Sequence, residues 1–173
     1  MRPCSLPANS LLDRYLDVHT YTDCYRVEVA VTITQAEFVH AFYTTWIFKL
    51  ERAILKWIVA KPSADAEAKQ LARGEIDRFA AWHVEDRNEN QLLLSDFSGR
   101  SRSWLMALPA GNNNPSGTEW YFGSAVIPII DPATGQARMG LLFRALLGFH
   151  GIYSRMLLHS AKSRLLRRAH QAG

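Results

Sequence analysis

Charged and aromatic side chains alternate along three expected strands, in a pattern that could orient a ligand. An arginine and a carboxylate, here Arg102 and Glu85, could hold the acidic or polar end of a ligand inside a mostly aromatic cavity. The candidate ligand-binding residues on these strands are Trp82, Glu85, Arg102, Trp104 and Tyr121. The alternative is that the charges pair across strands on a solvated face, which is common in antiparallel sheets.

The period of two in a strand divides these side chains between the two faces of a sheet. Along residues 79–87, which contain the expected strand 79–85, His83, Glu85 and Arg87 share one face and Trp82 lies on the other. The alternation does not indicate which face points toward the helices.

A histidine and a tyrosine, His150 and Tyr153, lie three residues apart on the apolar face of the expected C-terminal helix. Such a pair could act as general acid and base, because histidine titrates near neutrality and a buried tyrosine can donate a proton. The alternative is a pair of core residues that hydrogen-bond to the sheet. In both cases His150 and Tyr153 are candidates for lining a cavity, and the catalytic residues of any reaction stay unknown.

The sequence contains no motif for a metal ion or a nucleotide. His83-Val84-Glu85 is not followed by the Pro-Cys-x-x-Cys of zinc deaminases, and no His-Glu-x-x-His occurs. Glycine-rich phosphate loops and the Gly-x-Ser-x-Gly of hydrolases are also absent from the sequence. We therefore expect no metal site and no cofactor.

The excess of basic over acidic residues is confined to the last quarter of the chain. Of 20 basic and 16 acidic residues, all the acidic ones lie at or before Asp131, and seven basic residues follow it. Cations are favourable at the C-terminus of a helix, so this excess predicts no specific nucleic-acid partner. The alternative is a weak contact of the basic tail with an anionic membrane surface.

Composition and cysteine content indicate a globular intracellular domain. The 173 residues are 48% hydrophobic, enough for one domain with a substantial core. The sequence has no run of 18 apolar residues and no recognisable signal peptide. Two cysteines, Cys4 and Cys24, are too few for a disulfide scaffold and typical of a reducing compartment. We expect a cytoplasmic location.

The order of the expected elements indicates an α+β fold. The first 20 residues form a lead-in whose first ten are expected to be poorly anchored, and Thr34 and Glu37 have the spacing of a capping box. The expected elements are a strand at 23–32, helices at 37–58 that break near Thr44-Thr45, a helix at 64–73, strands at 79–85, 91–97, 100–108 and 118–130, and a helix at 138–169 with a basic tail. We expect a single domain, 1–173, in which a curved antiparallel sheet grips the long C-terminal helix.

This arrangement resembles the START-like superfamily, also called SRPBCC or helix-grip. The segment from Phe143 to His150, leading to Tyr153, is similar to the closing helix of poorly characterised members of that superfamily. Two features depart from the usual pattern, because we find four strands between the helix pair and the closing helix, fewer than the full set, and an additional helix at 64–73. The resemblance implies a cavity between the sheet and the C-terminal helix.

The resemblance therefore predicts binding of a small, mostly hydrophobic ligand of lipid-like or polyketide-like chemistry. One alternative is a cyclase or dehydratase that acts on such a ligand. Another is a domain that serves mainly homo-oligomeric association, for example as a homodimer.

Overall fold

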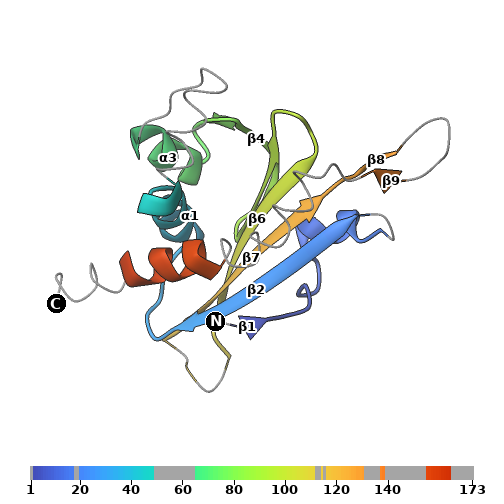
Figure 1. The fold of residues 1–173 in the computed structure, drawn as a ribbon. Helices are drawn as coiled ribbons and strands as arrows, with labels where there is room; N and C mark the ends of the chain where they lie inside the picture. Colours follow the sequence, from blue (N-terminus) through green and yellow to red (C-terminus); the bar gives the residue numbers. More distant parts are fainter. Residues whose placement is uncertain are drawn as a thin grey trace.

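A seven-stranded antiparallel sheet carries helices on one face and the N-terminal segment on the other (Figure 1). We call these the helix-facing side and the outer face. The computed structural model describes residues 2–17, 20–48, 65–111, 114, 116–130, 137–138 and 155–164. Within these residues the chain is α+β, as its pattern predicts.

Strands β3 to β7 form a meander, and the N-terminal strands β1 and β2 extend the sheet beyond β7. Their order is β1-β2-β7-β6-β5-β4-β3, so β2 pairs with the last long strand, β7. The strands are β1 (Arg2–Pro3), β2 (Tyr21–Val29), β3 (Arg78–Phe79), β4 (Trp82–Arg87), β5 (Gln91–Asp96), β6 (Ser101–Pro109) and β7 (Thr118–Val126). The short strands β8 (Ile129–Ile130) and β9 (Ala137–Arg138) form a separate hairpin.

The expected strand 118–130 and the expected helix 138–169 both differ from the structure at their boundary. β7 ends at Val126, and Pro128, which has no N–H to donate to a ladder, precedes the separate strand β8. Arg138 pairs with Ile129 in the β8–β9 hairpin, so it does not begin a helix. Of the expected C-terminal helix, residues 155–164 are helical, and its other residues after Arg138 lie outside the described part.

Helix α1 (Gln35–Tyr43) follows the cap that the sequence predicts and begins two residues before the expected start at 37. The Thr34 side chain accepts a hydrogen bond from the Glu37 N–H at 3.2 Å, and Glu37 accepts one from the Thr34 N–H at 2.9 Å. This capping box satisfies two donors that the first helical turn leaves open. α1 ends at Tyr43 with Thr44 as its C-cap, which confirms the expected break near Thr44-Thr45, and a further helix, α3 (Asp65–Ala72), packs beside it.

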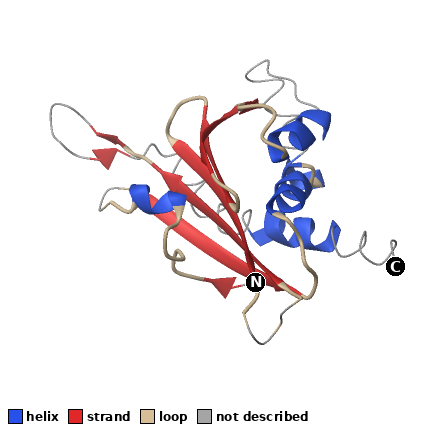
Figure 2. Cartoon of the chain, turned by 180° about the vertical axis from the view of Figure 1, so that it is seen from behind, coloured by secondary structure: helices blue, strands red, loops and turns tan. Residues whose placement is uncertain are grey.

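Aromatic side chains join the helices to the sheet. The rings of Phe38 and Trp120 stack with their centroids 4.7 Å apart, and those of Phe42 and Phe122 lie 4.9 Å apart. The helical segment 155–164 adds a third group of buried residues to this core: Leu157, Leu158 and Ala161. Figure 2 shows α1, α3 and this segment together on one side of the sheet.

The C-terminal helical segment is tied to both β2 and α1 by its basic side chains. Lys162 Nζ donates to the Glu28 carbonyl oxygen at 3.2 Å, and the Arg164 guanidinium donates to the Thr44 carbonyl at 2.5 Å. Part of the positive charge at this end of the chain therefore has an internal use. No helix among the described residues is sufficiently long and apolar to cross a membrane.

The N-terminal segment is anchored, which corrects the expectation of a loose lead-in. β1 pairs with β2, and the 3₁₀ helix η1 (Leu11–Tyr15) packs on the outer face with Leu12 fully buried. A Cβ atom at Gly123 would lie 2.8 Å from the Leu12 side chain. The absent side chain at Gly123 therefore makes the space that Leu12 fills.

A β-bulge in β4 changes the faces that strict alternation predicts. The register with β5 shifts between Val84 and Asp86, and such a bulge places an extra residue in one strand. Glu85 consequently points to the outer face together with His83, whereas Arg87 points to the helix side. The prediction that Arg87 shares a face with Glu85 is wrong for this reason.

Candidate functional site

Three polar side chains form a row across strands β2, β7 and β6 on the helix-facing side, near one end of these strands. Asp23 in β2 lies opposite Ser124 in β7, and Ser124 lies opposite Ser103 in β6. The Ser124 hydroxyl donates to Asp23 Oδ1 at 2.5 Å, and the Ser124 N–H donates to the same oxygen at 3.2 Å. Ser103 Oγ is 3.0 Å from the hydroxyl of Tyr43, which α1 supplies. Register and helix packing together create this row.

The carboxylate of Asp23 keeps one oxygen without a partner. Its Oδ2 is buried and has no hydrogen-bond partner within the described part of the chain. Tyr25 follows on the same side of β2, and burial together with the nearby Asp23 charge raises the pKa of Tyr25. The Arg155 guanidinium lies over the Tyr25 ring, 5.5 Å from its centroid. A cation over an aromatic face is attracted to it, so Tyr25 positions Arg155.

Arg155 also lines a groove between the C-terminal helical segment and the residues that follow α1. The groove has a volume of about 570 Å³, within the usual range of ligand sites. The described residues that line it are Trp46, Ile47, Arg155, Met156, His159, Ser160 and Ser163. They comprise large apolar groups, hydroxyls and basic groups, and none of them is a carboxylate.

The apolar surface of the groove is exposed to an unusual degree. Trp46 is 64% exposed and Met156 is 42% exposed, although both are large hydrophobic residues. Large apolar side chains that gather at a surface hollow mark a place where something binds. With Arg155 at the same hollow, the arrangement can accommodate an apolar body and an acidic end.

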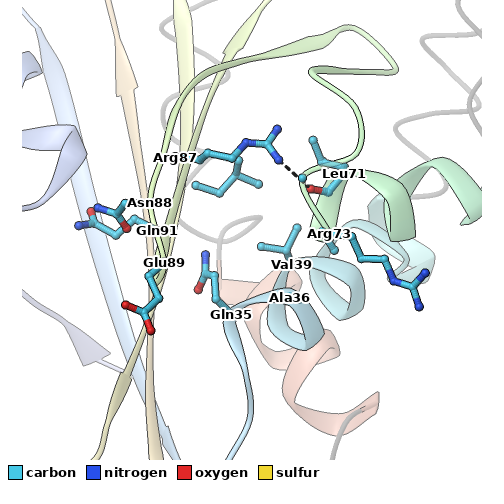
Figure 3. Close-up of a pocket in the computed structure, with 12 residues that line it drawn as sticks. Gln35, Ala36, Val39, Leu71, Arg73, Arg87, Asn88, Glu89 and Gln91 are labelled. Carbon is cyan, nitrogen blue, oxygen red and sulfur yellow. Dashed lines mark hydrogen bonds between the residues drawn. The ribbon is translucent and has the colours of Figure 1, made fainter.

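A second, smaller hollow lies between the N-terminus of α1, the C-terminus of α3 and the β4–β5 turn. Its volume is about 180 Å³, and Arg87 and Gln35 point into it while Arg73 points away (Figure 3). Arg87 is held by internal acceptors, since its Nη2 donates to the Ile76 carbonyl at 2.9 Å and to Asp77 at 3.0 Å. Because this arginine already closes the loop after α3, the smaller hollow offers less for a ligand than the groove.

The structure separates the residues that the sequence predicts as one ligand site. Trp82 packs against the helix-side core, whereas Trp104 and Tyr121 belong to the cluster on the outer face. Glu85 and Arg102 lie on the outer face as well, in contact with η1. The remaining two, His150 and Tyr153, lie outside the described residues. A single cavity between the sheet and the helices therefore does not collect the five described residues.

Glu85 and Arg102 form an internal clamp for η1. Arg102 forms an ion pair with Glu85, with Nε 2.5 Å from Oε2. Arg102 Nε donates to the Tyr15 hydroxyl at 2.8 Å, and Tyr15 donates to Glu85. Arg102 also donates to the Gly99 carbonyl at 2.8 Å, and its guanidinium lies 4.7 Å from the Tyr15 ring centroid. These contacts favour the alternative in which the charges pair with each other.

Trp104 and Tyr121 are likewise held by protein groups on the outer face. Trp104 Nε1 donates to Gln91 Oε1 at 2.9 Å, and both side chains are buried. The Tyr121 hydroxyl donates to Glu119 at 2.5 Å, and burial followed by this hydrogen bond raises the pKa of Tyr121 to about 12. Trp104 and Tyr121 therefore have structural partners under η1.

The row at Asp23, Ser103 and Ser124 is missing from the predicted site. Each of the three is a polar residue at a position where the alternation of its strand would place an apolar one. This pattern is the sequence feature that could have indicated them. The pairing register was needed to bring the three together, and a single strand does not reveal it. Trp46 and Arg155 carry no local signal, because only the packing of two distant segments makes them neighbours.

Comparisons with protein-family models, with curated proteins and with solved structures found no match for this chain. Among the described residues, no group of three or more His, Cys, Asp or Glu side chains is placed to hold a metal ion.

Proposed function

We propose that the protein binds a small, mostly hydrophobic ligand with an acidic end, of lipid-like or polyketide-like chemistry, in the groove at Trp46. The observation that carries the proposal is the joining of exposed Trp46 and Met156 to Arg155 in one hollow of about 570 Å³. The chemistry of these side chains fits a carboxylate on an apolar chain.

Burial of apolar surface would supply most of the affinity. Covering Trp46 and Met156 contributes about 25 cal/mol for each Å² removed from water, before the cost of association. Arg155 is exposed, so its pairing with a carboxylate contributes only about 1 kcal/mol. The apolar contacts therefore determine whether the ligand binds, and Arg155 determines which end of the ligand lies beside Tyr25.

The helix-grip arrangement is part of the same proposal. Two features support it. β2, which comes early in the chain, pairs with β7, the last long strand, and the helices lie on a single face of the sheet (Figure 1). In this arrangement the C-terminal helix forms one wall of the ligand site. The groove differs from the sequence-based expectation in one respect, since its other wall is the segment after α1 and not the sheet.

Native mass spectrometry of the purified protein with dodecanoate tests the proposal. We expect a one-to-one complex with the unaltered protein. Trp46→Ala should weaken the affinity for dodecanoate roughly tenfold, because the variant lacks the apolar indole surface that the ligand would cover. Phe97→Ala is the matched control, because Phe97 is 57% exposed and does not line the groove. Equal loss in the two variants, or no complex with the unaltered protein, would contradict the proposal.

A further inference from the structure

The two cysteines of the chain lie directly opposite each other at one edge of the sheet. β1 pairs with β2 through Arg2–Arg26 and Pro3–Tyr25, and the Cys4 N–H continues this pairing by donating to the Cys24 carbonyl at 3.0 Å. The two Sγ atoms are 3.2 Å apart, and both are free thiols. Twenty positions separate Cys4 from Cys24 in the sequence, so the fold creates the pair.

This placement meets the geometric requirement for a disulfide. Opposed residues in an antiparallel ladder have Cα atoms about 4.5–5.5 Å apart, inside the range that a disulfide spans. The sulfurs need to approach to roughly 2.05 Å, which rotation of the two side chains can provide. The backbone pairing of β1 with β2 is already in place.

The two thiols differ in access. Cys24 is 6% exposed and Cys4 is half-buried. Burial, followed by the contact with Cys4, raises the pKa of the Cys24 thiol. Because the thiolate is the nucleophile in disulfide exchange, Cys4 is the residue that meets an external oxidant first.

We propose that Cys4 and Cys24 are a thiol–disulfide modification site. The Cys4 thiolate attacks one sulfur of oxidised glutathione, which forms a mixed disulfide and releases one glutathione thiolate. Cys24 loses its proton to water and attacks the Cys4 sulfur, which forms the Cys4–Cys24 bond and releases the second glutathione. The cysteines lose two electrons, oxidised glutathione accepts them, and the two released thiolates take up the two protons.

The bond would fasten the segment that covers the outer face. Residues 4–24 contain η1 with buried Leu12, and Tyr15 with its contacts to Glu85 and Arg102. Closing a loop of about 20 residues lowers the unfolding equilibrium constant by roughly 250-fold in the chain-entropy description. For a domain of this size the melting temperature rises by about 10 °C. Oxidation therefore stabilises the attachment of η1 without touching the groove.

Incubation of the full chain with oxidised or reduced glutathione tests the inference. Each sample is alkylated, its intact mass is measured, and its melting temperature is recorded. We expect the oxidised protein to be a monomer with no alkylated cysteine and no glutathione adduct, and to melt about 10 °C higher than the reduced protein. A stable glutathione adduct, a disulfide between two chains, or two thiols that stay reduced would each overturn the inference.

Two variants separate the bond from the effect of losing a buried thiol. Cys4→Ser alters the more accessible partner, so reduced Cys4→Ser should melt close to the reduced unaltered protein and show no rise with oxidised glutathione. The melting temperature of Cys24→Ala should likewise not rise with oxidised glutathione. If Cys24→Ala fails to fold, the Cys4→Ser variant alone decides the test. A rise of similar size in Cys4→Ser would refute the assignment to this pair.

Discussion

Gly123 is the position on which attachment of the N-terminal segment depends most sharply. It lies in β7, opposite Cys24 on one side and Trp104 on the other. A Cβ atom at Gly123 would lie 2.8 Å from Leu12 Cδ2, 2.9 Å from the Asp23 carbonyl oxygen and 3.0 Å from Trp104 Cε3. Gly123→Ala therefore forces a shift of Leu12, of the β2 backbone, or of both.

The magnitude follows from these contacts. Overpacking a filled site costs about 1–3 kcal/mol, and the lower backbone entropy of unfolded alanine returns at most about 1 kcal/mol. We expect Gly123→Ala to lower the free energy of unfolding by about 2 kcal/mol. Leu12 is fully buried, so Leu12→Ala should cost about 3 kcal/mol.

Urea unfolding followed by tryptophan fluorescence measures both effects. A loss of about 2 kcal/mol lowers the urea midpoint by about 1 M. The matched control is Gly111→Ala, because nothing lies within 4 Å of a Cβ atom at Gly111, and it should stay within about 0.5 kcal/mol of the unaltered protein.

The double variant Leu12→Ala with Gly123→Ala decides whether the two positions share one space. Removing the Leu12 side chain makes room for the new methyl group, so the double variant should be more stable than the sum of the single losses by about 1 kcal/mol. Strict additivity, or a Gly123→Ala variant as stable as the Gly111→Ala control, would refute the reasoning.

Three tyrosines give further predictions. The pKa of Tyr121 in the folded protein is raised to about 12, so the contribution of this shift to stability is complete below about pH 10 and is lost as the pH rises toward 12. Tyr121→Phe should flatten this part of a plot of unfolding free energy against pH. An unchanged slope would count against the burial of Tyr121. Tyr15→Phe removes the hydroxyl between Arg102 and Glu85, so it should cost about 1 kcal/mol and speed amide hydrogen exchange in η1, whereas equal exchange would show that the clamp does not hold η1. Tyr43→Phe leaves Ser103 Oγ without its buried partner, for which thermal unfolding should show a loss of about 1–2 kcal/mol, and no loss would mean that Ser103 finds another partner.

Much of the fold follows from local sequence patterns. Apolar alternation predicts β2 and the meander from β4 to β7, and the spacing of Thr34 and Glu37 predicts the start of α1. These features depend on neighbouring residues, which the sequence presents directly. The threonine pair after α1 predicts its end for the same reason.

The remaining features depend on contacts between distant segments. The bulge after Val84 is invisible to a strict period of two, and it reversed the predicted face of Arg87. The anchoring of residues 2–15 depends on the missing side chain of Gly123, which is more than one hundred positions away. Such long-range complementarity has no local signature, so the sequence predicted a loose lead-in.

The candidate site shows the same limit. The sequence suggests Arg102 and Glu85 as groups that orient a ligand, with pairing between the charges as the alternative, and in the structure they contact each other and Tyr15. Which face meets the helices is determined by tertiary packing, and this packing places Arg155, and not Arg102, at the groove.

In the proposed function, the groove at Trp46 binds an apolar molecule whose acidic end pairs with Arg155. The most direct measurement is isothermal titration calorimetry of dodecanoate and of dodecanol into the unaltered protein, into Arg155→Gln and into Arg78→Gln, in which a distant exposed arginine is changed. Pairing of the carboxylate with Arg155 predicts that Arg155→Gln weakens dodecanoate binding about fivefold and leaves dodecanol binding unchanged, while Arg78→Gln alters neither. Equal effects of Arg155→Gln on the acid and the alcohol, or equal effects of the two arginine variants on dodecanoate, would contradict it.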